Sequence, residues 1–252
     1  MIRQSLLLTC VAVAGCTYLD QPGPLPVRRQ GLHIVRSVPP SGARQVGLRS
    51  ALTVYLNVAP APESIGASDV RLQTGTTEVT GEVRVDLLDR SLRFTPREPL
   101  RPELEYRLLV SHQVRGLDGS SFERSQLLEL TTGSRTNDDP PESPPPRAPS
   151  AIELQPLWNA RCAAGCHEGA SARARLDLSS PSAARASLRG VRSTELPALL
   201  RVAPGDHARS YLMRKLLAEH GFVGLPMPPS DATRLSPLEL RQVADWIDGG
   251  AE

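Results

Sequence analysis

The sequence is poor in aromatic side chains and in lysine. Aromatic residues make up 4% of the 252 positions. Lys215 is the only lysine, and the other 28 basic residues are arginines. With so few aromatic rings, apolar packing has to come mainly from Leu, Val and Ala. The formal net charge of +2 is nearly balanced, so the composition gives no indication of a nucleic acid or another polyanion as a partner.

Long hydrophobic runs are also missing. The apolar run from Leu6 to Gly15 is too short to cross a bilayer as a helix. It follows the positive start Met1-Ile2-Arg3 and ends in small residues, a pattern typical of a secretory signal. We therefore predict a signal peptide over 1–15 and a proline-containing tether over 16–31, with the body exported to a space where disulfides survive.

The end of the apolar run, Val13-Ala14-Gly15-Cys16, resembles a bacterial lipobox. That resemblance implies that Cys16 is acylated as the first residue of the mature protein and that Cys10 is removed with the leader. It also implies a lipid-anchored protein of the cell envelope, with the outer membrane as the expected destination, on its periplasmic or surface face. The alternative is ordinary signal cleavage nearby, with Cys16 a spare thiol.

Residues 32–133 predict an all-β sandwich. In 51–57 the residues Leu52, Val54 and Leu56 alternate onto one face, which is the period of a strand with one buried side. Further short strands are expected over 82–88, 91–94, 106–110 and 127–130, with a tight turn at Asp118-Gly119.

This stretch resembles the SbsA-type bacterial Ig-like domain. The resemblance is carried by Pro39-Pro40-x-Gly42, Leu92-x-Phe94-x-Pro96, Leu100 with Tyr106, and Asp118-Gly119 before the ending Leu130-Thr131-Thr132. It implies a spacer or adhesive module without chemistry of its own. Residues 134–150 follow as a proline-rich linker with almost no apolar side chains to bury.

The run Cys162-Ala163-Ala164-Gly165-Cys166-His167 is the chemical feature of the chain. Two thiols followed by an imidazole are the parts that attach haem covalently and ligate its iron, although C-x-x-x-C-H is one residue longer than the usual attachment run. If a preceding helix continues through the run, Cys162 and Cys166 share one helical face at i and i+4. The alternative is a small structural disulfide.

A second iron ligand is expected at Met227, within Leu225-Pro226-Met227-Pro228-Pro229. Thioether sulfur is a soft, neutral ligand that suits Fe(II), and the flanking prolines fix the backbone around it. Met213, His207 and His220 are weaker candidates, because Met213 belongs to a helical run and the two histidines are better explained as surface or capping residues.

The chain ends in a clearly marked helix. Ser236-Pro237-Leu238-Glu239 combines an N-cap serine, a proline in the first turn and a capping-box glutamate. Leu240, Val243, Ala244 and Ile247 then fall on one face, and Gly249-Gly250 stops the helix.

Residues 151–252 resemble the small cytochrome c domains of exported bacterial proteins. The matching stretches are Leu157-x-x-x-x-Cys162 through His167, Leu176-Asp177-Leu178, Val202-x-Pro204-Gly205-Asp206 with Ser210-Tyr211-Leu212, Met227-Pro228, and Leu235-Ser236 through Ile247 with Gly250-Ala251. The resemblance implies a mostly α fold and one haem c on Cys162 and Cys166. It also implies axial ligands from His167 and Met227, and electron transfer.

The leading hypothesis is a multidomain, lipid-anchored monohaem c-type cytochrome that carries electrons between redox proteins of the envelope. With both axial positions filled by the protein, no substrate position remains, so we expect no enzyme and no small-molecule substrate. The alternative is a non-redox surface lipoprotein with a binding or scaffolding Ig-like module, a Cys162–Cys166 disulfide and no haem. A third reading, an enzyme acting on peroxide or a small gas, requires that the Met ligand be lost.

Overall fold

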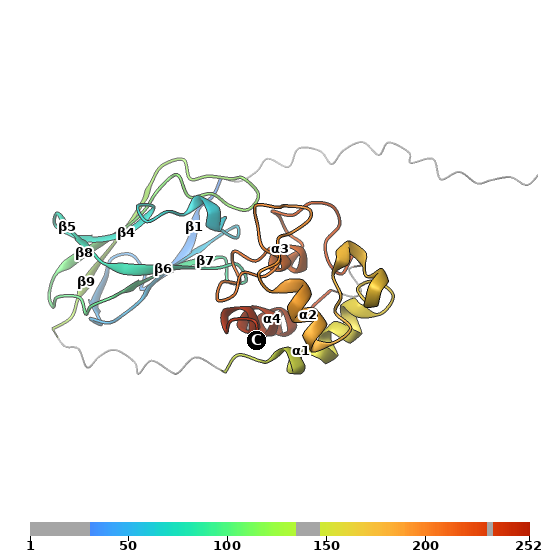
Figure 1. The fold of residues 1–252 in the computed structure, drawn as a ribbon. Helices are drawn as coiled ribbons and strands as arrows, with labels where there is room; N and C mark the ends of the chain where they lie inside the picture. Colours follow the sequence, from blue (N-terminus) through green and yellow to red (C-terminus); the bar gives the residue numbers. More distant parts are fainter. Residues whose placement is uncertain (1–30, 135–146, 231–233) are drawn as a thin grey trace, which may run out of the picture. The chain divides into compact units, whose positions relative to one another are not determined.

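The computed structural model describes residues 31–134, 147–230 and 234–252 (Figure 1). The expected signal peptide, the lipidation site Cys16, the tether up to residue 30 and most of the expected linker lie outside these residues. Within the described part of the chain, no helix is both long enough and apolar enough to cross a membrane.

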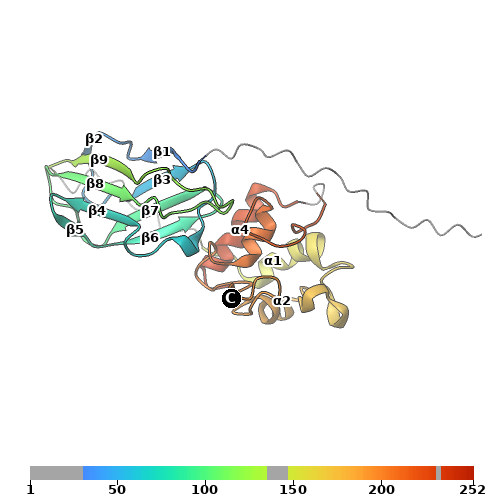
Figure 2. The ribbon, with the colours of Figure 1, turned by 90° about the horizontal axis from the view of Figure 1, so that it is seen from above.

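Residues 34–132 form two β-sheets that pack face to face (Figures 1 and 2). One sheet has the order β1-β3-β7-β6 and the other β2-β9-β8-β4-β5. Neighbouring strands pair antiparallel except β2 and β9, which run parallel. The strands are β1 (Ile34–Val38), β2 (Ala43–Val46), β3 (Leu52–Leu56), β4 (Val70–Thr74), β5 (Thr77–Val79), β6 (Gly81–Asp86), β7 (Ser91–Pro96), β8 (Glu105–Val110) and β9 (Gln126–Thr132).

The core of the sandwich follows the alternation in the sequence. Leu52, Val54 and Leu56 of β3 are buried, while the residues between them are only partly covered. In β8, Tyr106 is buried among aliphatic side chains and its hydroxyl accepts a hydrogen bond of 2.7 Å from the amide of Arg101. A buried phenol with a partner costs little, so the ring contributes its full apolar area to the core. The expected all-β sandwich is confirmed.

Four α-helices lie in the described residues that follow the sandwich: α1 (Ala151–Trp158), α2 (Pro181–Leu188), α3 (Tyr211–Leu217) and α4 (Pro237–Asp248). Capping boxes start two of them, Ser150 with Glu153 at α1 and Ser236 with Glu239 at α4. Each box pairs two orphaned main-chain donors at the start of its helix. The predicted start and end of the last helix are confirmed, because α4 begins at Pro237 and is capped by Gly249.

The core of the helical segment is built around two tryptophans. The rings of Trp158 and Trp246 meet edge to face, with centroids 6.2 Å apart and an interplanar angle of 68°, an arrangement that aromatic quadrupoles favour. Val243, Ala244 and Ile247 of α4 pack into the same cluster, as the helical period predicts. In a chain with so few aromatic rings, this pair occupies a large share of the core.

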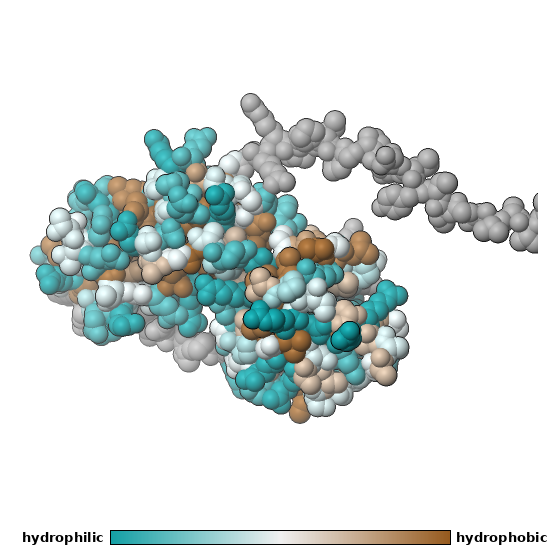
Figure 3. All heavy atoms as spheres, turned by 45° about the horizontal axis from the view of Figure 1, so that its top comes forward, coloured by the Kyte–Doolittle hydropathy of each residue, from teal (hydrophilic) through white to brown (hydrophobic). Residues whose placement is uncertain are grey.

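The sandwich contributes side chains to this second core. Ala59 and Leu87 are buried in the cluster that contains Trp158 and Trp246. Leu87 directly follows β6, where the strand has ended. The sandwich is therefore part of what holds the helical segment together. On the face drawn in Figure 3, hydrophilic side chains alternate with small apolar areas.

His207 lies in a buried cluster of charges next to Leu87. Its Nδ1 lies 2.9 Å from Asp248 Oδ2, and its Nε2 lies 3.6 Å from Asp86 Oδ1 and 3.4 Å from the amide nitrogen of Leu87. Burial by itself lowers the pKa of His207, but hydrogen bonding to Asp248 and Asp86 outweighs burial and raises the pKa to about 9. The expectation of a surface or capping role for this histidine is wrong, because the ring is buried between two carboxylates. Those carboxylates are distant in sequence, so no local pattern indicates them.

The His207 cluster predicts a loss of stability at alkaline pH. The folded pKa of about 9 exceeds the ordinary value of 6.5, so the contribution is complete below pH 6.5 and is lost as the pH rises through about 9. We expect the free energy of unfolding to fall by about 1–3 kcal/mol across this window. Denaturant unfolding at both ends of the window measures the loss, and the same loss in His207→Gln would contradict the assignment.

Candidate haem site

An apolar cavity of about 320 Å³ in the helical segment brings the sequence-predicted residues together. Cys162, Cys166, His167 and Met227 all line it. Much of the remaining wall is apolar, including Trp158, Leu178, Leu188, Leu212 and Leu216. The volume lies within the range of roughly 300–1,000 Å³ that is usual for small-molecule sites.

The cysteine run leaves the helix before it reaches the second thiol. After α1, residues Asn159–Ala163 form a π-helical turn, Ala164 takes ψ 114°, and Gly165 takes φ +72°. The expectation that Cys162 and Cys166 share one helical face is therefore wrong. The amide of His167 donates to the carbonyls of Cys162 (3.3 Å) and Ala163 (3.0 Å), so the wide turn and the glycine absorb the extra residue and keep the run compact.

The ring of His167 is fixed by the main chain through Nδ1. Its Nδ1 lies 3.1 Å from the carbonyl oxygen of Arg173, which can only accept, so Nδ1 carries the proton. Burial lowers the pKa of His167, against the opposing effect of its main-chain hydrogen bonds. Nε2 of a neutral imidazole with this tautomer has a lone pair available for a metal.

Of the four described candidates for the second ligand, Met227, Met213, His207 and His220, only Met227 lines the cavity. Met213 is fully buried in the core around the tryptophans, His207 pairs with Asp248, and His220 is exposed. The amide of Met227 donates to the carbonyl of Lys215 at 2.9 Å. This bond ties the methionine to α3, although Met227 itself lies outside any helix or strand.

Polar groups of the wall were not found by sequence reasoning. The Nε1 atom of Trp158 is fully buried without a hydrogen-bond partner in the structure. The guanidinium of Arg201 donates to the carbonyls of Ala174 (2.6 Å), Ser187 (2.8 Å) and Arg175 (3.2 Å). It thereby fixes the chain just after Arg173, the partner of His167. No local pattern in the sequence indicates the burial of the Trp158 indole nitrogen or the carbonyl partners of Arg201.

These residues fit a haem. The donor set of two thiols, one neutral imidazole and one thioether is the set that c-type haem requires. The wall is mainly apolar, as a porphyrin face requires, and the arginines Arg161 and Arg173 at the wall suit its carboxylate groups.

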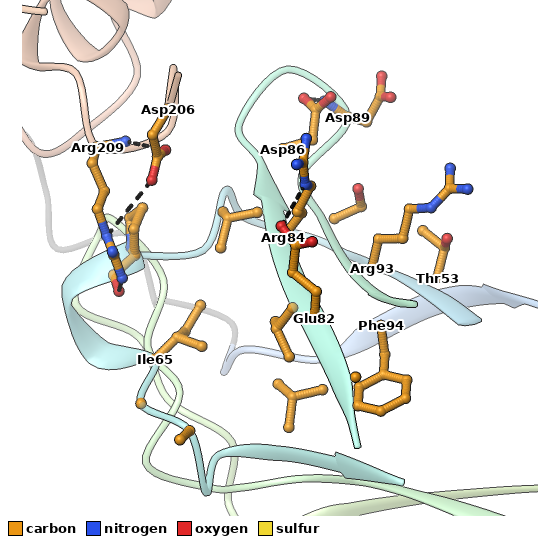
Figure 4. Close-up of a pocket in the computed structure, with 18 of the residues that line it drawn as sticks. Thr53, Ile65, Glu82, Arg84, Asp86, Asp89, Arg93, Phe94, Asp206 and Arg209 are labelled. Atoms are coloured by element: carbon orange, nitrogen blue, oxygen red, sulfur yellow. Dashed lines mark hydrogen bonds and ion pairs between the residues drawn. The ribbon is translucent and has the colours of Figure 1, made fainter. Parts of the chain in front are cut away.

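A larger hollow of about 870 Å³ lies against β6 and β7 (Figure 4). Charges of both signs line it, and several pair with each other, as Arg84 does with Glu82 at 2.8 Å and Arg209 with Asp206 at 3.9 Å. The described residues include no cluster of three or more His, Cys, Asp or Glu side chains that could hold a metal ion. The same absence holds for the apolar cavity, where Cys162, Cys166 and His167 do not form such a cluster.

Comparison with protein families gives a match for the β-sandwich. Residues 28–132 match the bacterial Ig-like domain family. The match covers less than half of the chain and ends before the helical segment. It supports the expected Ig-like fold, and it leaves the residues around the cavity without a family.

Solved structures with some similarity include surface and copper-resistance proteins. The N-terminal part of the bacterial S-layer protein SbsC has 12% identity and a TM-score of 0.33, covering 41% of this chain and 24% of the S-layer chain. PcoC, a methionine-rich copper resistance protein from Escherichia coli, has 18% identity and a TM-score of 0.32, covering 41% of this chain and 99% of that one. Similarity at this level adds nothing to the family match.

No curated protein matches this chain. The chain spans about a quarter of the S-layer structure named above. The comparisons give no support to the resemblance of residues 151–252 to cytochrome c. This segment contains helices, but most of its described residues lie outside them, and a cytochrome c fold is not shown.

The cavity predicts a slow thiol at Cys162 in haem-free protein. Burial raises the pKa of Cys162 to about 12, and the thiolate is the form that reacts with alkylating reagents. In a Cys10→Ser, Cys16→Ser, Cys166→Ser variant at neutral pH, we expect alkylation at least about tenfold slower than for a short cysteine peptide. Mass spectrometry measures the rate, denaturant should restore it, and an equally fast folded protein would show that the cavity is open to solvent.

Proposed function

We propose that this protein is an exported Ig-like module whose helical segment binds one haem c and carries electrons between redox proteins of the cell envelope. One observation supports this: Cys162, Cys166, His167 and Met227 line a single apolar cavity. Met227 lies sixty residues after His167. A common ligand would explain why these residues meet at one surface, although Cys162 and Met227 also pack against the core around the two tryptophans.

Each of these four residues would have its own role in binding the haem. Cys162 and Cys166 would hold the haem through thioether bonds, His167 would bind the iron through Nε2, and Met227 through its sulfur. When bound, haem supplies a reversible one-electron couple. The apolar wall excludes water from that couple, and a thioether ligand favours the reduced state and raises the potential.

If His167 and Met227 both bound the iron, no position on it would remain for a substrate. We therefore propose an electron carrier, with no small-molecule substrate and no nucleic-acid partner. A lipid on Cys16 would hold the protein at the membrane, with the outer membrane as the expected location. The Ig-like domain would then present the haem segment to its redox partners.

Covalent haem is directly testable by mass and by colour. The exported protein from a host competent for cytochrome maturation should be red, should give a pyridine haemochrome spectrum, and should keep its haem under denaturation. Cys166→Ser should lose one thioether and most of the holoprotein yield, and His167→Ala should lose normal iron ligation. A mature polypeptide that weighs only its amino acids and acyl chains would exclude the proposal.

The role of Met227 has its own test. Met227→Ala should keep covalent haem but open one axial position, so that peroxidase activity rises at least about tenfold over the parent. A peroxidase assay on equal haem concentrations measures this, with Met213→Leu, a core methionine outside the cavity wall, as control. A parent that already has five-coordinate iron would instead favour an enzyme.

A non-redox surface lipoprotein is the second candidate. The comparisons support it better than the haem proposal, because they identify the Ig-like domain and nothing that binds haem. In this candidate the Ig-like domain binds or scaffolds at the cell surface. The disulfide expected with it is not formed in this structure, where Cys162 and Cys166 are free thiols. A colourless protein with a Cys162–Cys166 bond would favour this candidate.

A further inference from the structure

The only lysine of the chain is buried beside the cavity. Lys215 lies on α3, its side chain is 8% exposed, and it lines the cavity wall. Its Nζ lies 2.6 Å from the carbonyl oxygen of Val223, 2.8 Å from that of Leu225 and 2.7 Å from a carboxylate oxygen of Glu195. An ammonium has three N–H donors, and here each has an acceptor.

The main chain of the same residue holds Met227. The carbonyl of Lys215 accepts the amide of Met227 at 2.9 Å. Lys215 therefore contacts positions 223, 225 and 227, with its side chain holding the first two and its backbone the third. Between α3 and α4 the segment Val223–Met227 has no helix or strand, and Val223 and Leu225 are exposed, so few other contacts fix it.

Two further side chains complete the network. The hydroxyl of Tyr211 donates to Glu195 at 2.6 Å and accepts the amide of Val223 at 3.0 Å. Tyr211 and Lys215 are four residues apart on α3, on one face of the helix. Glu195 thus joins both, and the three side chains tie the segment to the helix.

We propose that Lys215 is a positioning residue that fixes the segment Val223–Met227 so that the Met227 thioether faces the cavity. This inference rests on the proposed function, since it assigns the segment a ligand to present. A loop without regular structure samples many conformations, and ordering it in advance removes that cost from binding. Buried hydrogen bonds from an ammonium are strong enough to select one conformation.

The choice of lysine in an arginine-rich chain follows from geometry. Three acceptors from different parts of the chain converge on one nitrogen. A compact ammonium can direct its donors to three converging acceptors, whereas a guanidinium is planar and spreads its donors over a fork. The 28 other basic residues are arginines. The lysine therefore stands at the position where three acceptors converge on one nitrogen. Lys215→Arg should therefore behave as a damaging substitution.

The test compares Lys215→Met and Lys215→Arg with Arg214→Met in the full chain, produced with haem attachment. Arg214 is the matched control: it is buried on the same helix and pairs with Glu63 at 2.7 Å, but it does not line the cavity. We expect all variants to keep covalent haem by intact mass. In both Lys215 variants the absorption band of the methionine–iron(III) bond should fall at least fivefold, and cyanide should bind at least tenfold faster, with Arg214→Met unchanged.

A second readout does not depend on haem. In haem-free protein, hydrogen exchange of the amides of Val223 and Met227, which donate to the Tyr211 hydroxyl and the Lys215 carbonyl, should be at least tenfold faster in Lys215→Met than in the parent and Arg214→Met. Should Lys215→Met fail to fold, Glu195→Gln and Tyr211→Phe keep the shape of the network and should give smaller changes in the same direction.

The outcomes separate the two proposals. A parent without haem excludes the proposed function, while exchange at the amides of Val223 and Met227 still decides whether Lys215 fixes the segment. Unchanged exchange in Lys215→Met overturns the inference. Faster exchange with an intact methionine–iron band overturns the positioning role, because the thioether would then reach its place without the network.

Discussion

Main-chain carbonyls bound by buried cations fix the walls of the apolar cavity. Arg201 gathers the carbonyls of Ala174, Arg175 and Ser187 on the side of His167. Lys215 gathers those of Val223 and Leu225 on the side of Met227. Val223 and Leu225 lie outside any helix or strand, whereas Ala174 and Arg175 belong to a short 3-10 helix and Ser187 to α2, so Arg201 joins two helical pieces and Lys215 holds an irregular segment. The arrangement of the candidate ligands depends on these two side chains.

Burying a cation is costly unless its donors are satisfied. Lys215 meets that condition with the carbonyls of Val223 and Leu225 and the carboxylate of Glu195, and Arg201 places three of its five N–H donors on main-chain carbonyls. The same bonds that make burial tolerable also restrict the segments that accept them. A cavity lined by irregular segments can in this way be as well defined as one lined by helices. The remaining walls come from the helices and from Trp158, whose place is set by its contact with Trp246.

The sequence predicted the parts whose signals are local. Strand β3 alternates and is buried on one face, and α4 carries its own cap and stop signals. Strands β1, β2, β4 and β5 were not individually recognised, since β1 is largely exposed and β2 pairs with β9 from the other end of the domain. Alternation reports burial on one side of a strand, and it is weak where the burial is partial.

The candidate site shows the same division. The cysteine run, His167 and Met227 were found because their residue types carry the chemistry. The path between the thiols was predicted incorrectly, because a π-helical turn and Gly165 replace the continuous helix. The roles of Lys215, Arg201 and His207 depend on partners brought close by folding, such as Asp86, which lies 3.6 Å from His207. No spacing rule reveals such partners.

The burial of the only lysine gives the chain a built-in reporter. A protease that cuts only after lysine has one target bond in the whole sequence, between Lys215 and Leu216, and that bond lies inside α3. Reagents that acylate amines likewise find one side chain to modify, covered in the folded state. Cleavage at this bond measures how often α3 unfolds locally. Acylation measures how often the amine of Lys215 becomes exposed.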